Sequence, residues 1–239
     1  MIFFFKYILI LITATILLAN DKASFVLMDK TFNKATIVFN NEEVKTEKNG
    51  MYDKFLNYET LTVDDGLPEL PKYTFNYGLN PSKEYEINYN IISSHTIDDI
   101  DIHPHQSAER IEFNKSNELY VNASYKESNN IFPQEIIQNQ RATIRGNEIL
   151  SIDIIPFNFN SAARSLEVYD EIEIVIEEVG DRATLEPTMK RSKTFQNIYN
   201  NLIIDTFDSR EIDFQEPSIL YICGGSSIDY TYLDYLVEW

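Results

Sequence analysis

Apolar and polar residues alternate one by one along much of this chain, a pattern typical of half-buried β-strands. In the run "YEINYNIIS", Tyr85, Ile87, Tyr89 and Ile91 fall on one face, and mostly polar residues fall between them. Residues that favour strands, mainly Ile, Val, Tyr, Phe and Thr, supply most of the apolar positions. We therefore predict a mainly β structure with antiparallel sheets.

Two longer alternating runs, Ile149–Phe159 and Leu166–Val179, flank the polar, turn-like stretch "NSAARS". We expect them to pair as a long hairpin. The alternation changes phase around Asp170, which predicts a β-bulge, and Pro156 marks an edge or a bulge in the first run. Shorter strands are predicted at Ser24–Asp29, Ala35–Asn40, Lys72–Tyr77 and Glu118–Ala123.

The character of the chain changes after Gly180. The stretch "DRATLEPTMKRSKTF" is polar and carries the densest basic cluster, including Lys190 and Arg191, so it reads as a linker. Apolar residues at helical spacing predict a short helix over Phe195–Ile203. A short apolar run, Ile219–Cys223, is then followed by two glycines and a second helical pattern.

A strand, a glycine turn and a helix are the first unit of an α/β domain. Since the sequence stops at Trp239, part-way through this helical pattern, we expect the front part of a longer protein. At the other end, Lys6 precedes an apolar run from Tyr7 to Ala19 that is short for a membrane span. We predict a secretory signal peptide cut between Ala19 and Asn20, with a retained N-terminal anchor as the alternative.

The composition supports an exported globular protein. The chain has 239 residues, 44% of them hydrophobic, and a formal net charge of −18. Such acidity argues against nucleic acid or anionic lipid as a partner. The lone Cys223 cannot form an internal disulfide, and its apolar neighbours indicate a buried, inert thiol.

Two groups of residues invite a metal site. His103 and His105 lie on one side of an extended H-x-H stretch near Asp98, Asp99 and Asp101, which could hold zinc weakly, although a solvated loop is the favoured interpretation. The alternating glutamates Glu171, Glu173, Glu177 and Glu178 could bind calcium, but they are more typical of an exposed sheet face. No metal or other cofactor is expected.

The segment "GLPELPKYTFNY" contains two prolines that fix an extended backbone, so it reads as a rigid start to a strand. It resembles the G-x-P-x-L-P motif of gingipain-family prodomains, with Gly66, Pro68, Leu70 and Pro71 in place. Further similar stretches follow in the same order. In "IDIHPHQ" the matching residues are Pro104 and Gln106. In the stretch 156–169 they are Pro156, Phe159, Asn160, Leu166, Val168 and Tyr169. Ser161 stands where proline is common in the family.

The resemblance implies a secreted cysteine endopeptidase precursor. Its parts would be a signal peptide (1–19), a β-sandwich-like propeptide domain (20–180), a linker with a short helix (181–215), and the first strand and truncated helix of a caspase-like α/β catalytic domain (216–239). The propeptide would assist folding and cover the active-site cleft of its own or a cognate peptidase domain. Membrane contact would be limited to the signal peptide.

The resemblance places the catalytic histidine and cysteine beyond these residues, so no catalytic residue is expected here. Basic residues that could enter the cleft are Lys126, Arg141 and Arg145, and the sequence does not choose among them. Lys190–Arg191 is either a maturation site or part of a plain hydrophilic linker. The alternative function is a secreted β-sandwich binding module or adhesin with no enzyme attached.

Overall fold

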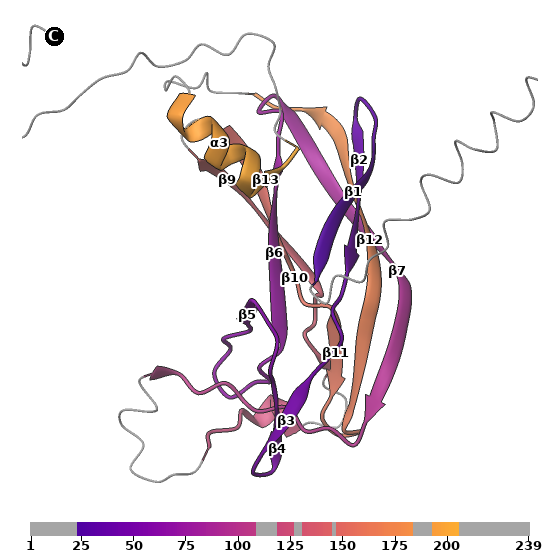
Figure 1. Cartoon of the computed structure of the whole chain (residues 1–239), viewed down its shortest axis with the longest axis vertical. Helices are drawn as coiled ribbons and strands as arrows, with labels where there is room; N and C mark the ends of the chain where they lie inside the picture. The colour runs from indigo at the N-terminus through magenta and orange to yellow at the C-terminus, as the bar shows by residue number, and fades with distance from the viewer. Residues whose placement is uncertain (1–22, 109–118, 127–130, 145–146, 184–192, 206–239) are drawn as a thin grey trace, which may run out of the picture.

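A sandwich of two β-sheets forms the body of the protein (Figure 1). The computed structural model describes residues 23–108, 119–126, 131–144, 147–183 and 193–205. The six-stranded sheet contains β1 (Ser24–Lys30), β2 (Lys34–Asn40), β7 (Lys83–Asp98), β8 (Ile131–Phe132), β11 (Phe157–Asn160) and β12 (Ser165–Asp181). The five-stranded sheet contains β5 (Thr60–Leu61), β6 (Pro71–Gly78), β9 (Ile137–Ile144), β10 (Asn147–Ile154) and β13 (Ile203–Ile204).

Three further elements complete the described structure. Strands β3 (Thr46–Asn49) and β4 (Tyr52–Phe55) form a separate hairpin at one end of the sandwich, near the 3-10 helix η1 (Ala123–Lys126) (Figure 1). Helix α3 (Lys193–Leu202) lies near the opposite end. The strand pairs are antiparallel, except that β13 runs parallel to β6.

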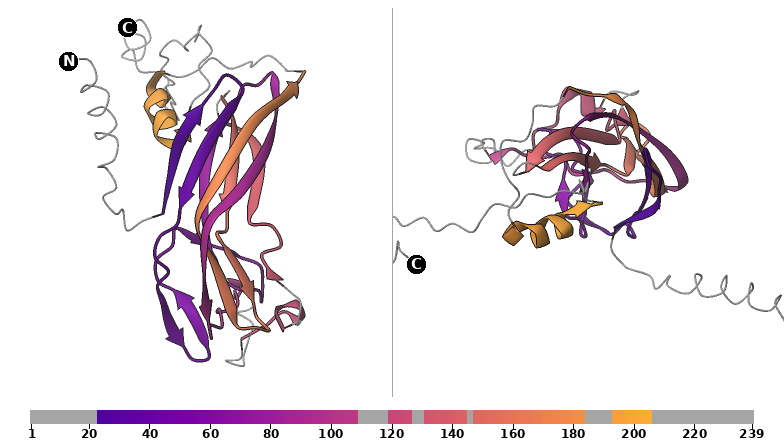
Figure 2. Two further views of the ribbon diagram at one scale, coloured as in Figure 1. Left: turned by 90° about the vertical axis from the view of Figure 1, so that its right-hand side faces the viewer. Right: turned by 90° about the horizontal axis from the view of Figure 1, so that it is seen from above.

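Strand β12 organises the larger sheet. One edge pairs with β7 along almost its whole length, and the other edge pairs first with β11 and then with β2 (Figure 2). Its inward side chains Leu166, Val168, Ile172, Ile174 and Ile176 are buried, as the alternation predicts. The register with β7 shifts between Tyr169 and Glu171, which confirms the predicted bulge.

The core between the sheets has two parts. One cluster joins β2 and β12 to β6 and β10, and includes Phe39, Tyr73 and Ile152. The second lies toward the β3–β4 end and includes Leu70 and Phe157. Because no disulfide is available within this part of the chain, these two clusters supply the main stabilisation of the fold.

The predicted long hairpin is wrong in its first half. The run Ile149–Phe159 is split, so that β10 joins the five-stranded sheet and only β11 pairs with β12. The break falls at Pro156, which has no N–H to give to a sheet ladder. The N–H of the preceding residue, Ile155, donates to the carbonyl of Ile136 at 2.8 Å and so extends the pairing of β10 with β9. The chain then crosses to the other sheet.

A second expectation also fails. The described part of Glu118–Ala123 contains no strand. Its backbone groups bond to Gln106 and Gly66, and the chain then continues into η1.

The predicted inner face of β7 is only partly covered by the second sheet. Tyr89 is 49% exposed and Ile91 is 37% exposed, since β7 is an edge strand that the second sheet does not fully overlie.

The predicted helix is present as α3, which packs on the five-stranded sheet through Tyr199 beside Ile149 and Ile203. The described part of the expected linker therefore belongs to the domain body.

Several predicted features lie outside the described residues. These are the signal cleavage residues Ala19 and Asn20, the basic pair Lys190–Arg191, and residues 216–239 with Cys223. Among the described helices, none is long and apolar enough to cross a membrane.

Candidate functional site

The proline segment, Gly66–Glu69, and the "HPHQ" segment, His103–Gln106, lie side by side as two extended strips. The N–H of Gly66 donates to the carbonyl of His105 at 2.8 Å, and the N–H of Glu69 donates to the carbonyl of His103 at 2.9 Å. Pro68 and Pro104 face each other in an antiparallel bridge. The structure therefore brings together motif residues that are far apart in the sequence.

A third strip closes this arrangement. The side-chain amide of Gln106 accepts from the N–H of Tyr120 and donates to its carbonyl, each at 2.9 Å. The N–H of Asn122 donates to the carbonyl of Gly66 at 3.0 Å. We call the three strips, Gly66–Glu69, His103–Gln106 and Tyr120–Asn122, the motif junction.

Gly66 is required at this junction for two reasons. Its φ is +74°, a conformation that L side chains rarely adopt. A Cβ at this position would also lie 2.6 Å from Cε1 of the Tyr120 ring and 2.7 Å from the backbone nitrogen of Asn122. The tyrosine ring therefore packs directly on the glycine backbone.

The remaining proline-motif residues tie the junction to the core. Leu70 is completely buried in the second core cluster, and Pro71 begins β6. The hydroxyl of Thr62 donates to the carbonyl of Pro68 at 2.7 Å and accepts from the N–H of Leu70 at 3.0 Å. Pro156 is buried elsewhere, at the crossing between the sheets, and its carbonyl accepts from Tyr169.

Both histidines of the junction bind one carboxylate. His103 Nδ1 lies 3.2 Å from Oε2 of Glu69, and His105 Nδ1 lies 3.0 Å from Oε1. Burial, together with the positive charge of Lys54, lowers the pKa of His103. Close by, burial raises the pKa of Tyr125, whose hydroxyl donates to the carbonyl of Ile102 at 2.5 Å.

The H-x-H stretch is not the solvated loop that its sequence favoured, because His103 is buried and both imidazoles bind Glu69. Among the described residues, no group of three or more histidine, cysteine, aspartate or glutamate side chains could hold a metal ion. Glu171, Glu173 and Glu177 lie along the outer face of β12, partly exposed, as a solvated sheet face would. The arrangement of the junction suits it to fixing backbone geometry.

The candidate cleft residues have different positions. Arg141 is tied into the domain, because its guanidinium donates to Glu148 at 2.6 Å and to the carbonyl of Lys83 at 3.1 Å, and lies 6.0 Å from the centre of the Tyr85 ring. Lys126 is the last residue of η1, on the chain that returns from the junction. Arg145 lies outside the described residues.

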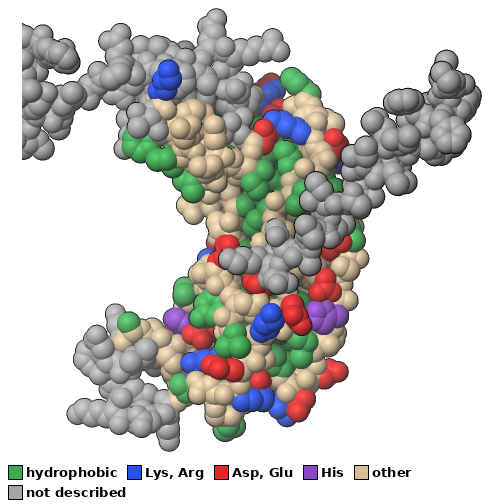
Figure 3. Space-filling view, in the orientation of Figure 1, with side chains coloured by type: hydrophobic (Ala, Val, Ile, Leu, Met, Phe, Trp, Pro, Cys, Tyr) green, Lys and Arg blue, Asp and Glu red, His purple; other side chains and the backbone are tan. Residues whose placement is uncertain are grey.

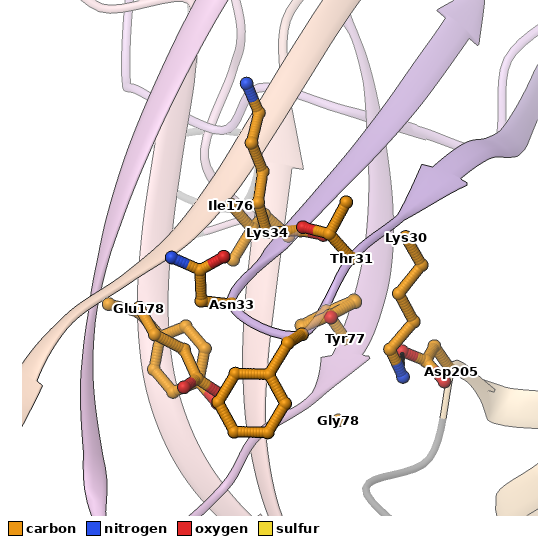
Figure 4. A pocket seen from close by; sticks show the side chains of 11 residues that line it. Lys30, Thr31, Asn33, Lys34, Tyr77, Gly78, Ile176, Glu178 and Asp205 are labelled. Carbon is orange, nitrogen blue, oxygen red and sulfur yellow. Dashed lines mark hydrogen bonds and ion pairs between the residues drawn. The ribbon is translucent and has the colours of Figure 1, made fainter.

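Two cavities adjoin different ends of the sandwich. A cavity of about 370 Å³ lies beside the junction, between Asp64, Leu67, Ser124 and the Ile131–Glu135 stretch. A cavity of about 500 Å³ lies at the other end, between the β1–β2 turn and Asp205 (Figure 4). In the second, Lys30 pairs with Asp205, and Tyr85 donates to Glu178 at 3.0 Å.

The surface differs between these two ends. Figure 3 shows charged side chains of both signs gathered over the half that carries β3 and β4, and a strip of hydrophobic side chains between α3 and the β1–β2 hairpin. Exposed apolar residues on that hairpin include Met28 and Phe32.

Sequence reasoning missed three residues that form or hold the junction. Glu69 and Tyr120 lie in the junction itself, and Thr62 holds it to the core. None of the three has a sequence pattern of its own, since each is defined by a contact that the alternation of residues does not predict. A signal was available only for Glu69, which sits between two prolines opposite an H-x-H pair.

Comparisons with known proteins agree with this architecture. The Propeptide_C25 family model matches residues 25–211. A sequence comparison with curated proteins returns no match.

Two solved structures share the fold. The complex of Porphyromonas gingivalis RgpB pro- and mature domains matches with a TM-score of 0.59 and 18% identity, over 75% of this chain and 94% of that one. A structure concerning zymogenic latency of gingipain K from Porphyromonas gingivalis matches with a TM-score of 0.56 and 20% identity, over 69% of this chain and 96% of that one. Since the family model spans most of the sequence and the mainly β fold agrees with it, the chain belongs to the gingipain (C25 peptidase) propeptide family.

Proposed function

We propose that this chain is the N-terminal part of a secreted gingipain-like cysteine endopeptidase precursor, and that its β domain binds the catalytic domain and keeps it latent. The observation that carries the proposal is the motif junction, which holds Gln106 and Tyr120 side by side. It occurs in a fold shared with the RgpB prodomain, which was solved with its mature domain.

The junction gives a physical reason for tight binding. Gln106 and Tyr120, which bound residues 107–119, are held together at one fixed point. Fixing both ends of a segment before binding lowers the ordering entropy that the complex must overcome. This segment carries Arg110 and Lys115, and Arg141 is already engaged within the domain. We therefore assign contact with the active-site cleft to residues 107–119.

The same proposal covers export and maturation. Residues 1–19 act as a signal peptide that is cut between Ala19 and Asn20, and the mature precursor is extracytoplasmic. Lys190–Arg191 is the processing site between the propeptide and the peptidase domain that begins near residue 216. Hydrolysis belongs to that later domain.

Inhibition in trans tests the proposal. Residues 20–215 are purified and added to a matching gingipain-type catalytic domain, and hydrolysis of a peptide substrate is followed. We expect hydrolysis to slow, and we expect the double variant Arg110→Ala/Lys115→Ala to inhibit less while unfolding at the same temperature. A folded propeptide that leaves the peptidase fully active contradicts the proposal and favours the binding-module alternative.

A further inference from the structure

Glu69 occupies a central position in the motif junction. Its two carboxylate oxygens each bind a different imidazole, His103 Nδ1 at 3.2 Å and His105 Nδ1 at 3.0 Å. Because an ionised carboxylate only accepts hydrogen bonds, each neutral imidazole donates its Nδ1–H. One side chain from the proline strip therefore holds two side chains from the facing strip.

The surroundings of the two histidines differ. The side chain of His103 is only 9% exposed, whereas that of His105 is 23% exposed. The edge of the His103 ring meets the Tyr52 ring, with centroids 6.0 Å apart, and the positive charge of Lys54 acts on it from β4. Asp53, also on β4, is engaged with Lys48 at 2.7 Å, and its backbone carbonyl accepts from His103.

We propose that Glu69, His103 and His105 form a pH-sensitive clasp, which holds the motif junction closed at neutral pH and loosens it as the pH falls below about 6.5. The clasp regulates the same site to which we assign latency, so its effect on the peptidase rests on the proposed function. Its effect on the junction itself does not.

Burial and charge decide whether acidification opens or closes the clasp. In the closed junction, a second proton on His103 would place an imidazolium in a largely buried site, beside Lys54 and His105, and these costs outweigh its attraction to the Glu69 carboxylate. The pKa of His103 is therefore lower in the folded protein than in an opened state, where it is near 6.5. Between the two pKa values the opened state binds more protons, so acidification favours opening.

The two histidines act together. His105 is the more exposed of the pair, and its charge is a minor cause that adds to the lowering of the pKa of His103. Opening then separates the backbone pairs on both sides of Glu69, including that between Gly66 and His105. Because Gly66 bonds to both His105 and Asn122, its release loosens the strips on both sides of residues 107–119 and weakens the entropic advantage in binding.

Amide hydrogen exchange of residues 20–239 tests the clasp directly. Protection factors, corrected for the intrinsic pH dependence of exchange, are measured between pH 7.5 and 5.5 for the N–H groups of Gly66, Glu69 and His105. We expect them to fall several-fold, by up to about tenfold for each unit by which the folded pKa of His103 lies below 6.5. Protection that stays constant over this range overturns the proposal.

Two variants make the test specific. His103→Asn offers a side-chain amide that donates to Glu69 at every pH, so its protection factors should change much less with pH. His95→Asn removes an exposed histidine that pairs with Asp170 at 2.9 Å on the larger sheet, and should keep the full pH dependence. Equal pH dependence in wild type and His103→Asn overturns the proposal.

A second measurement covers the case in which His103→Asn does not fold. An NMR titration of the imidazoles in the wild-type chain should give His103 a pKa below 6.5, and a value at or above 6.5 overturns the clasp. Inhibition of the catalytic domain is compared at pH 7.5 and 5.5 as a separate readout. Absence of inhibition at both values refutes the latency function while leaving the exchange result to decide the clasp.

Discussion

Gln106 pairs with Tyr120 as a backbone strand would, because its side-chain amide both accepts from the N–H and donates to the carbonyl of that residue. The same amide nitrogen also lies within bonding distance of the carbonyls of Pro104 and His105, at 3.1 and 2.9 Å. One side chain thus replaces a strand pair between residues 106 and 120. This explains why glutamine, with a donor and an acceptor on one planar group, suits this position.

Replacing Gln106 by leucine should open this point locally. Leucine has a similar volume but removes the two bonds from Gln106 to the backbone of Tyr120, at a cost of about 1–3 kcal/mol for a part-buried site. We expect limited proteolysis between residues 107 and 119 to become faster. The control is Gln140→Leu on the exposed face of β9, which should leave the cleavage rate unchanged. Equal rates in the two variants would show that Gln106 does not hold the segment.

Gly66→Ala should be more costly than Gly50→Ala. Gly50 also has a positive φ, +68°, but a Cβ there meets nothing within 4 Å. Gly50→Ala therefore reports backbone strain alone, about 1–2 kcal/mol. Gly66→Ala adds the collision with Tyr120 and Asn122. Urea unfolding should give a clearly lower free energy of unfolding for Gly66→Ala, and equal values would argue against the close approach.

The alternation of the sequence predicts the strands well where one face is buried along the strand. β2, β6 and β12 lie within a residue or two of the expected ranges, and so does β1, although most of its side chains are exposed. The phase shift at Asp170 even locates the bulge, because the period of two makes any inserted residue visible. The resemblance to gingipain prodomains supplied the family, which physical patterning alone could not.

The failures share a physical cause. The split between β10 and β11 depends on partners outside the run. The N–H of Ile155 donates to Ile136 in one sheet, and the carbonyl of Pro156 accepts from the N–H of Tyr169 in the other. The backbone of Tyr120 bonds to the side chain of Gln106, and no local sequence pattern predicts this contact. Side chains that replace backbone partners across long sequence separations are invisible to periodicity.

Arg141→Met should lower stability without changing inhibition. Methionine keeps an apolar chain beside Tyr85 but removes the bonds to Glu148 and to the carbonyl of Lys83. Losing charge-assisted bonds of this kind costs about 1.5–3 kcal/mol when they are buried, and less at this part-exposed site. The control is Arg182→Met, which removes a more exposed partner of Glu148. Lost inhibition in a folded Arg141→Met propeptide would restore Arg141 as a cleft residue.

Thr62→Val tests how the proline motif is held to the core. Pro68 and Pro71 have no backbone N–H to donate. The buried hydroxyl of Thr62 donates to the carbonyl of Pro68 and accepts from the N–H of Leu70. Valine has the same shape, so the substitution removes these two bonds and leaves the packing nearly intact. We expect the free energy of unfolding to fall by about 1–3 kcal/mol. Thr62→Ser keeps the hydroxyl and loses only a methyl group, about 1 kcal/mol. If thermal or urea unfolding ranked the serine variant below the valine variant, packing of the methyl group rather than the hydroxyl would be what fixes the motif.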